Sequence, residues 1–367
     1  MFKQYKLKNY KFILVLFVVI LNVIGILLIG SAKPSVQGKQ IVGMIAGLSI
    51  MVILSLIDYN FILKFAWLIY LFMLGTLLLV MFAGDDAGGA QRWFEIGGFR
   101  FQPSELAKIL IILFFAYFFM KHEEKINTPK VLIMSLILAG IPLALILKQP
   151  DLSTTIVTAL IFAALLFVAG LSYKIVTGVL AVSVPSAIIL FTLLIQDKLP
   201  FIKSYQVTRV MAWLYPDDYP ADAYQQQNSI MAIGSGQLWG KGLNNTDATS
   251  VKNGNFIPEP QTDFIFAVAG EELGFIGTVI IIILLLFITI ECILIARKAK
   301  DTAGKMICCG FAALVGFQSL VNIGVASGVL PNTGLPLPFV SYGLTSLLSL
   351  YIGVGLVLNV GLQPKKY

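Results

Sequence analysis

Charged residues and the usual metal-binding side chains are scarce in this sequence. Of 367 residues, 12% are charged, three are cysteine and one is histidine, whereas 58% are hydrophobic. Cys292, Cys308 and Cys309 lie in or beside apolar segments without a C-x-x-C spacing, and His122 stands alone, so neither a disulfide framework nor a Cys/His metal site is expected. So few charges leave too little polar surface to cover a soluble core, which predicts an integral membrane protein.

Apolar runs of about 20 residues repeat along the chain, each bounded by charged residues, proline or glycine. They predict one all-α polytopic membrane domain over 1–367, with about ten transmembrane helices. The predicted spans are 12–29, 40–57, 62–82, 104–120, 130–147, 153–169, 173–195, 264–295, 304–326 and 337–360. The first follows several lysines as a signal sequence would, but it is long and lacks a clear cleavage site, so we interpret it as a retained anchor.

The distribution of lysine and arginine predicts the orientation. With a cytoplasmic N-terminus, the inside segments hold Lys3, Lys6, Lys8, Lys11, Lys64, Lys121, Lys125, Lys130, Lys174, Arg297, Lys298, Lys300, Lys305, Lys365 and Lys366. The short outside loops hold only Lys33, Lys39, Arg92, Arg100 and Lys148. The positive-inside rule therefore places both termini in the cytoplasm. The net charge of +7 is mostly a topology signal; it adds attraction to membrane lipids, and nothing indicates nucleic acid.

One outside connection, the extracytoplasmic loop 196–262, is far longer than a link between helices requires. It mixes aromatic and aliphatic residues with turn residues, so we expect short amphipathic helices on the outer membrane surface rather than disorder. Its "GSGQLWGKG" is not a phosphate-binding loop, because Ser235 and Gly242 stand where that motif needs Gly and Ser or Thr. Two interpretations stay open: a glycine-rich turn of special backbone geometry, or a backbone cradle for a lipid-linked diphosphate in which Lys241 binds substrate.

The stretch 88–108 ends an outside loop and opens the fourth predicted span. Pro103 and Ser104 suit a helix start, and Glu105 falls in the first turn. Glu105 and Lys108 are three residues apart, so they share a helix face just inside the membrane. An uncompensated charge there is costly, so the two side chains are expected either to form a helix-start ion pair or to face a functional polar cavity.

Other polar residues interrupt the apolar sequence on the same side. Arg92 and Trp93 suit either an interfacial anchor or a substrate contact. Asp151, in a very short connection, suits the cap of the sixth span because Asp-x-x-Thr is typical of a helix N-terminus. The stretch 328–346, which contains Ser341, has prolines and glycines that break the helix without adding charge. Such broken backbone at membrane depth is tolerated where it lines a cavity or is buried in protein.

Two carboxylates stand where "NFIPEPQTDFIF" becomes apolar. Pro258 and Pro260 predict an extended, non-helical approach. Asp263 then falls at the helix start, where backbone N–H groups would stabilise its ionised form. It suits either an N-cap or a catalytic carboxylate, and Glu259 suits either a metal or substrate contact or a side chain that only faces water.

Four motifs, in order and in register, resemble one family. "QRW...FRFQPSELAK", "KQPDLST", "AIGSGQLWGKG...FIPEPQTDFIFAVAGEELG" and "LPFVSYG" are similar to those of the SEDS family, the RodA, FtsW and SpoVE proteins of the bacterial cell wall, over about 12–362. The run Arg-Phe-Gln-Pro-Ser-Glu is most like the RodA or sporulation branch. The resemblance implies a GT-C-like membrane fold and a peptidoglycan glycosyltransferase that polymerises lipid II at the outer face of the bacterial plasma membrane. It also implies a class B penicillin-binding protein as partner.

The resemblance also implies site residues. Asp263 matches the essential acidic residue of the family's large loop, and Glu105 and Lys108 match a charged pair that lines the family's central cavity. Trp93 matches a tryptophan that is functionally sensitive in the family. One departure is "SYGLTS", where the family commonly has Ser-Tyr-Gly-Gly-Ser. The full set of candidates is Asp263 as the catalytic residue, Glu105, Lys108 and Asp151 in the cavity, and Arg92, Trp93, Gln102, Ser104, Lys241, Glu259 and Ser341 for substrate.

Glycosyl transfer from a lipid diphosphate needs a base at the acceptor hydroxyl and positive charge at the leaving group. We expect Asp263 to be the base. Lys108, Arg92 or a divalent cation (Mg²⁺ or Mn²⁺), for which Asp263 is the candidate ligand, would balance the diphosphate; no organic cofactor is expected. Two alternatives stay open: a flippase for the lipid-linked precursor, because charges and broken helices also mark transporters, and a non-catalytic scaffold of the wall machinery.

Overall fold

The computed structural model describes residues 9–86, 91–96, 99–195, 204–245, 250, 254 and 256–363. The helices are α1 (Phe12–Ala32), α2 (Pro34–Leu56), α3 (Tyr59–Leu63), α4 (Ala66–Ala83), α5 (Pro103–Lys121), α6 (Pro129–Lys148), α7 (Leu152–Val168), α8 (Tyr173–Ile195), α9 (Ser204–Leu214), α10 (Pro220–Ser235), α11 (Ile265–Arg297), α12 (Thr302–Ala326) and α13 (Leu344–Leu362), with a 3-10 turn at Glu123–Lys125. Three short strands, β1 (Asp85–Asp86), β2 (Gln91–Ile96) and β3 (Phe99–Phe101), form an antiparallel sheet in that order.

Helices occur at all ten positions where the apolar runs predict a span. Within the described residues, eight of them are long and apolar enough to cross a membrane: α1, α2, α4, α5, α6, α11, α12 and α13. α7 has 17 residues, and α8 is apolar over Tyr173–Ser183, so the number of ten spans stays a prediction. The all-helical fold class is confirmed apart from the small sheet, which the sequence analysis missed.

Local sequence signals explain where most helices begin. Proline opens α2, α5, α6 and α10, because the first helical residue has no intrahelical use for the N–H that proline lacks. Aspartate caps α3, α7 and α12: the side chains of Asp58, Asp151 and Asp301 accept hydrogen bonds from backbone N–H groups in the first turn. The predicted cap at Asp151 is therefore confirmed.

Two predicted spans differ in detail. The last one was expected from residue 337, but α13 begins only at Leu344, since 338–340 form a turn and 341 a bend. The long α11 is broken at Gly274, whose φ of 66° belongs to the left-handed region that glycine adopts without strain. Its first part, from Ile265 to the break, is thereby a short helical segment close to the loop residues of the site.

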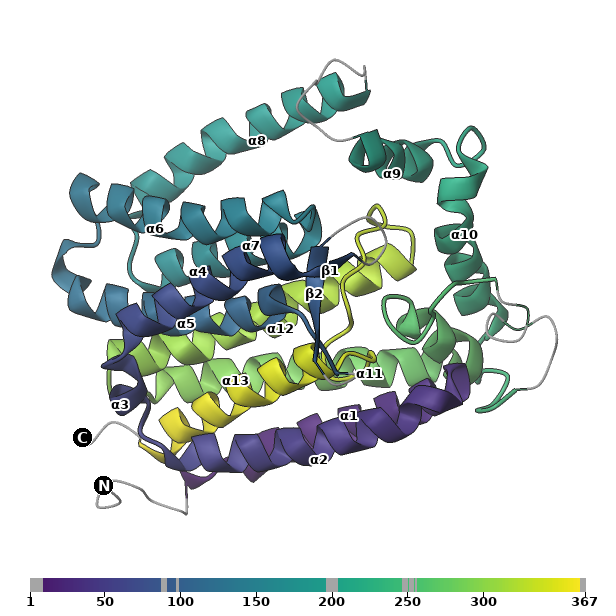
Figure 1. Cartoon of the computed structure of the whole chain (residues 1–367), viewed down its shortest axis with the longest axis horizontal. Coiled ribbons are helices and arrows are strands. Elements are labelled where there is room, and N and C mark those ends of the chain that lie inside the picture. Colours follow the sequence, from purple (N-terminus) through teal and green to yellow (C-terminus); the bar gives the residue numbers. More distant parts are fainter. Residues whose placement is uncertain are drawn as a thin grey trace.

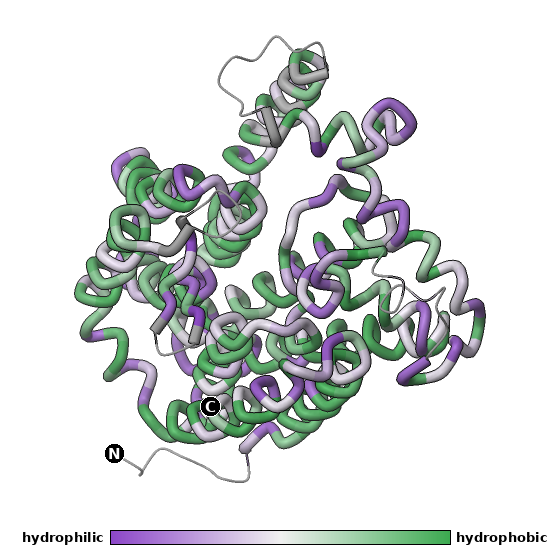
Figure 2. The backbone as a smooth tube through the Cα atoms, turned by 45° about the vertical axis from the view of Figure 1, so that its right-hand side comes forward, coloured by the Kyte–Doolittle hydropathy of each residue, from purple (hydrophilic) through white to green (hydrophobic). Residues whose placement is uncertain are grey.

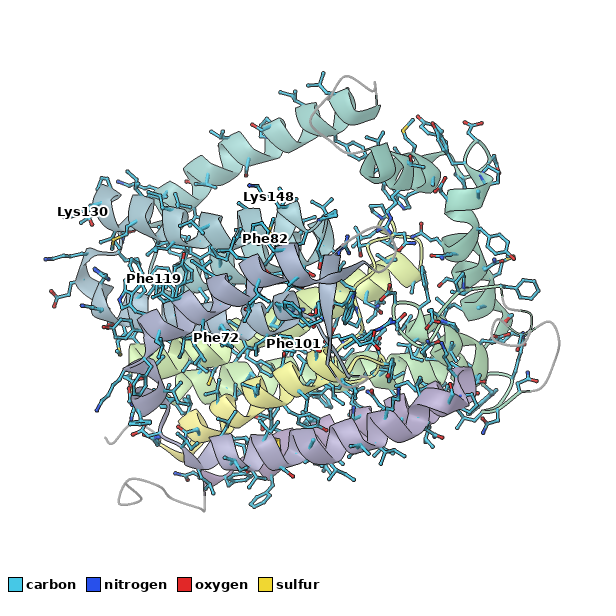
Figure 3. The ribbon with its side chains drawn as sticks, viewed as in Figure 1. Phe72, Phe82, Phe101, Phe119, Lys130 and Lys148 are labelled. Atoms are coloured by element: carbon cyan, nitrogen blue, oxygen red, sulfur yellow. The ribbon has the colours of Figure 1, made fainter. Side chains whose placement is uncertain are left out.

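Helices α5, α12 and α13 lie inside the bundle, and the surrounding helices expose apolar faces. α13 packs along α2, α12 packs against α11, α7 and α5, and α1 runs along α11 (Figure 1). On the outer helices large apolar side chains are exposed, for example Phe72 at 55% and Phe82 at 85% on α4 (Figure 3). Lys130 and Lys148 mark the two ends of α6 (Figure 3), as expected of a helix whose middle lies in lipid.

The polar connections gather at one end of the bundle. Most of the helical tube is hydrophobic, and hydrophilic residues concentrate at the turns and around the α9–α10 region (Figure 2). Hydrogen bonds there link the sheet to the α6–α7 turn, the start of α7 to the segment before α13, and that segment to the one before α11. At the opposite end Lys11, before α1, lies beside Gly361 of α13. The structure therefore separates one polar, loop-rich end from the end at which α1 starts and α13 finishes.

Within the predicted long loop, α9 and α10 confirm that it contains short helices. Residues 196–203, 246–249, 251–253 and 255 of this loop lie outside the described residues, as do 87–90 and 97–98 of the loop that carries Arg92, and the terminal residues 1–8 and 364–367.

Candidate active site

Asp263 lies directly before α11, between two loop segments. Its backbone carbonyl accepts a hydrogen bond of 2.7 Å from Asn322 of α12, and a Cβ added at Gly334 would stand 3.2 Å from its Oδ2. The helix cap is Phe264, and α11 has no side-chain cap. The expectation that Asp263 uses its carboxylate to cap the helix is therefore wrong. The carboxylate accepts no hydrogen bond from the described residues, which leaves its oxygens available to a ligand.

The surroundings of Asp263 favour its protonated form. The side chain is half-buried, and burial raises its pKa to about 6 from an ordinary value of 3.8. Arg209 of α9 lowers the pKa, whereas the charges of Asp151 and Glu105 raise it. Stabilisation of the ionised form by the N–H groups of α11 is not observed, because Asp263 does not cap that helix. A carboxylate whose pKa lies near neutrality is suited to take up a proton during turnover.

Asp151 joins the starts of α5 and α7. Its Oδ1 accepts a hydrogen bond of 3.1 Å from the Thr154 N–H, while its Oδ2 lies 3.4 Å from Gln102 Nε2 and 3.5 Å from Ser104 Oγ. The Gln102 N–H in turn donates to Thr345 Oγ1 of α13 over 3.2 Å. Asp151 and Ser104 are buried. The structure thus brings three predicted site residues together, with Asp151 as their common acceptor.

Glu105 and Lys108 form a buried ion pair on α5. Lys108 Nζ lies 2.7 Å from Glu105 Oε1 and 2.8 Å from Gln318 Oε1 of α12, and all three side chains are buried. Gln318 Nε2 continues the chain to the carbonyl of Pro336, at 2.9 Å. The shared helix face predicted from the spacing is confirmed. Lys108 donates to two protein acceptors, and its contact with Glu105 neutralises that buried carboxylate.

Arg92 is tied to the protein backbone rather than directed at an open site. Its guanidinium donates to the carbonyl of Gln149, at 2.7 Å through Nε, and to the carbonyl of Pro150. Trp93 beside it is half-buried in β2, opposite Asp85 in the strand register. Arg92 therefore fastens the sheet to the α6–α7 turn that carries Asp151, and the structure does not bring it forward as a free cation for a diphosphate.

The glycine-rich segment after α10 is clamped onto the broken part of α11. The N–H groups of Lys241 and Gly242 donate to the carbonyls of Glu271 and Glu272 at 2.9 and 3.0 Å, and the N–H of Gly240 donates to Gly236. A Cβ at Gly240 would stand only 2.2 Å from the Glu272 carbonyl oxygen. The turn of special geometry is thus confirmed, with φ of 77° at Gly240. The backbone cradle for a diphosphate is wrong for these three N–H groups, because they are already paired.

Lys241 and Glu259 both form ion pairs. Lys241 Nζ lies 2.8 Å from Glu271 Oε1, and the Glu271 side chain is buried. Glu259 Oε1 lies 2.7 Å from Lys33 Nζ at an exposed position, and that hydrogen bond lowers the pKa of Glu259 below its ordinary value. Glu259 is therefore ionised and paired with Lys33.

Ser341 supports the turn before α13. Its hydroxyl accepts a hydrogen bond of 2.7 Å from the Leu337 N–H, and its carbonyl accepts one of 3.2 Å from Gln40 of α2. The neighbouring Tyr342 N–H donates 2.8 Å to the Gln261 carbonyl. These bonds join the segment before α13 to α2 and to the segment before α11, so Ser341 holds loop geometry next to the site.

Three residues of the site were missed from the sequence. Arg209 acts on Asp263 electrostatically, Asn322 holds its backbone, and Gln318 pairs with Lys108. The buried amides Gln318 and Asn322 are four apart on α12, so a polar stripe on an apolar helix was a signal that could have been read. Arg209 lies in the amphipathic run of α9, where only the fold shows its nearness to Asp263.

The residues present could hold a divalent cation only if phosphate oxygens of a substrate supplied further ligands. Among the residues that the structure describes, no three His, Cys, Asp or Glu side chains gather as a metal-binding group. Mg²⁺ is, however, commonly held by one or two carboxylates together with phosphate oxygens and water. Asp151 and Glu105 already accept hydrogen bonds from protein groups, so Asp263 is the carboxylate with oxygens left for such an ion.

Comparisons with known proteins cover nearly the whole chain. A family model described as "Cell cycle protein" and named for FtsW, RodA and SpoVE matches residues 7–366. The peptidoglycan glycosyltransferase MrdB of Escherichia coli K12 is 37% identical over 359 residues, with 96% of this chain and 93% of that protein covered. A probable peptidoglycan glycosyltransferase FtsW of Geobacter sp. M18 is 33% identical over 383 residues, covering 98% of this chain and 99% of the relative.

Solved structures agree with this match. A chain from a structure described as the structural coordination of polymerization and crosslinking by a peptidoglycan synthase complex superposes with a TM-score of 0.77 at 30% identity, covering 96% of this chain and 97% of that chain. RodA, the rod shape determining protein of Thermus thermophilus, superposes with a TM-score of 0.68 at 28% identity, with 96% of both chains covered. With its long apolar helices this is a multi-pass membrane protein, and the chain belongs to the FtsW, RodA and SpoVE family.

Proposed function

We propose that this protein is a peptidoglycan glycosyltransferase that polymerises lipid II into β-1,4 glycan strands at the outer face of the plasma membrane, in cell elongation or shape control. The observation that carries the proposal is Asp263. It is a half-buried carboxylate with a pKa near 6 that accepts no hydrogen bond from the described residues and stands among the loops of the polar end. The names of the relatives support the reaction class.

In the proposed reaction Asp263 takes the proton from the 4-hydroxyl of the acceptor GlcNAc. The oxygen forms a bond to the anomeric carbon of the lipid-linked MurNAc of the growing chain, and the bond from that carbon to the diphosphate breaks. Attack from the opposite face inverts the α-linked donor to a β-1,4 product. Burial of Asp263 serves this step because a base whose pKa is close to the working pH accepts a proton readily and is still ionised before the reaction.

Positive charge is needed where the diphosphate leaves. Arg209, exposed on α9 and close enough to lower the pKa of Asp263, joins Arg92 and Lys108 as a candidate for this role. When bound, a divalent cation such as Mg²⁺ or Mn²⁺ would neutralise charge on the diphosphate. Titration of a chelator against polymerisation of purified lipid II, with each cation added back, tests that part.

The proposal extends to topology and partner. Both termini would lie in the cytoplasm, in keeping with the lysine distribution and with α1 starting where α13 finishes. A class B penicillin-binding protein would crosslink the strands. The similarity to a chain from a synthase complex that coordinates polymerization with crosslinking supports such a partner.

An assay with the purified protein in liposomes, to which lipid II is added from outside, tests the function by measuring glycan polymer. We expect glycan polymer from the wild type and from Asp217→Asn, an exposed carboxylate in the α9–α10 turn, and a loss of about 10²- to 10⁴-fold with Asp263→Asn. Transfer of labelled lipid II across the membrane without polymer would instead indicate the flippase. Neither transfer nor polymer would indicate the scaffold.

A further inference from the structure

Asn322 places a single buried amide between the two loop segments that meet at Asp263. Its side chain, near the end of α12, is 1% exposed. Nδ2 donates to the carbonyl of Asp263 at 2.7 Å and to the carbonyl of Leu335 at 2.6 Å. Both protons of the amide therefore go to backbone oxygens, one in the segment before α11 and one in the segment before α13.

The second carbonyl matters because its segment passes beside the Asp263 carboxylate. Gly334, next to Leu335, has a φ of 75°, and a Cβ there would lie 3.2 Å from Asp263 Oδ2. The two segments are joined again by the hydrogen bond from the Tyr342 N–H to the Gln261 carbonyl. Asp263 does not cap α11, so its carboxylate is not held by helix N–H groups. The position of its backbone depends on these links between the segments.

We propose that Asn322 is a positioning residue for the glycosyl transfer: by holding the Asp263 and Leu335 carbonyls on one amide it sets the place of the Asp263 carboxylate beside Gly334. The inference rests on the proposed function for its kinetic consequence, but its structural part stands on hydrogen bonds alone. A base must lie within hydrogen-bond reach of the proton it takes, and a displacement of about 1 Å at a reacting group can reduce turnover by about 10²-fold.

The chain offers a matched control. Gln226 of α10 is another buried side-chain amide, and its Nε2 donates to two carbonyls, Val325 at 2.8 Å and Leu330 at 2.7 Å. Both acceptors flank the turn after α12, and neither belongs to the segment that carries Asp263. Replacing Gln226 removes two amide-to-carbonyl hydrogen bonds of the same kind nearby. It therefore measures the loss of stability that such bonds cause without disturbing Asp263.

The experiment compares Asn322→Leu, the smaller change Asn322→Ser, and Gln226→Leu, all in the full-length chain. We expect both Asn322 variants to lower kcat for lipid II polymerisation by about 10- to 100-fold with KM within about twofold, while Gln226→Leu keeps kcat within about threefold at a similar loss of thermal stability. Equal kcat values for an Asn322 variant and Gln226→Leu would overturn the proposal.

Hydrogen–deuterium exchange gives a readout that does not need turnover. In both Asn322 variants we expect faster exchange in 256–264 together with 331–342, whereas Gln226→Leu should affect the turn around 325–330. Unchanged exchange in the two segments would overturn the positioning role whatever the activity. If the wild type itself makes no polymer, the proposed function fails, and the exchange result still decides whether Asn322 holds Asp263.

Discussion

Two aspartates that precede long helices, Asp263 before α11 and Asp301 before α12, have opposite environments. At the end where α1 starts, Asp301 accepts hydrogen bonds of 2.8 Å from the Gly304 N–H and from the Tyr59 hydroxyl. At the polar, loop-rich end, Asp263 caps nothing, and no described residue donates a hydrogen bond to its carboxylate. The carboxylate of Asp301 is therefore used in hydrogen bonds that hold the fold, whereas that of Asp263 has none from the described residues, as the proposed role of a base requires.

The neighbours of each carboxylate continue the contrast. Beside Asp301, Asn359 accepts the Tyr59 N–H at 3.0 Å and donates to the Ser55 carbonyl at 2.8 Å, while Gln363 donates to Asn359 at 3.1 Å. Around Asp263 the buried amide of Asn322 serves the backbone and not the carboxylate. Buried polar groups whose hydrogen bonds are all made stabilise one structure. Burial raises the pKa of Asp263, whose carboxylate accepts no hydrogen bond from the described residues.

The largest effect on stability is expected at the buried ion pair of α5. Lys108→Met would leave Glu105 charged and uncompensated inside the bundle, which should lower the free energy of unfolding by about 3–5 kcal/mol. The double variant Glu105→Gln, Lys108→Met removes both charges and should recover most of that loss. Denaturation in mixed micelles measures both, and a Lys108→Met protein as stable as the wild type would contradict the assignment of Lys108 to neutralising Glu105.

A smaller effect is expected from Tyr59→Phe at the opposite end. The change removes the hydroxyl that donates to Asp301 but keeps the ring beneath Lys300, whose Nζ lies 5.0 Å from the ring centroid. Loss of a hydrogen bond to a charged group should lower the free energy of unfolding by about 1.5–3 kcal/mol, with polymerisation of lipid II unchanged. A loss of turnover without a loss of stability would show that this end is not merely structural.

The pH dependence of turnover tests the environment of Asp263. Because Asp263 must be ionised to act as a base, kcat/KM should fall about tenfold for each pH unit below its pKa of about 6. Arg209 lowers that pKa, so Arg209→Gln should raise it and move the acid limb to higher pH. An acid limb near the ordinary aspartate value of 3.8, or one that Arg209→Gln does not move, would contradict the environment described for Asp263.

Short-range features of this structure could be predicted from the sequence. The apolar runs located the helices, the Asp-x-x-Thr pattern gave the cap at Asp151, and the spacing of Glu105 and Lys108 gave their pairing. Each of these depends on groups three or four residues apart, whose geometry is set by the helix itself. The prolines before Asp263 also correctly predicted that its approach is not helical, but the predicted extended conformation is wrong: the segment forms bends and turns, with φ of 51° at Glu259.

Long-range contacts decided the rest. Arg92 binds a carbonyl 57 residues away, Lys241 pairs with a carboxylate 30 residues away, and Asn322 reaches the backbone of Asp263 over 59 residues. Nothing in the local sequence shows that a cation is already occupied or that a carboxylate is left without a donor. Arg92 and Lys241 are candidates for substrate binding, and their contacts within the protein could not be predicted from the sequence.

The central claim is that Asp263 serves the reaction and Asp301 the fold. The most direct test compares Asp263→Asn with Asp301→Asn, measuring the unfolding midpoint and the polymerisation of lipid II for each. Asparagine removes one charge at each site with little change of shape. We predict that Asp263→Asn reduces turnover by about 10²- to 10⁴-fold and leaves the unfolding midpoint equal to or above that of the wild type. Asp301→Asn should lower the stability by about 1 kcal/mol and keep turnover. A folded Asp263→Asn protein that polymerises lipid II at the wild-type rate would contradict the account.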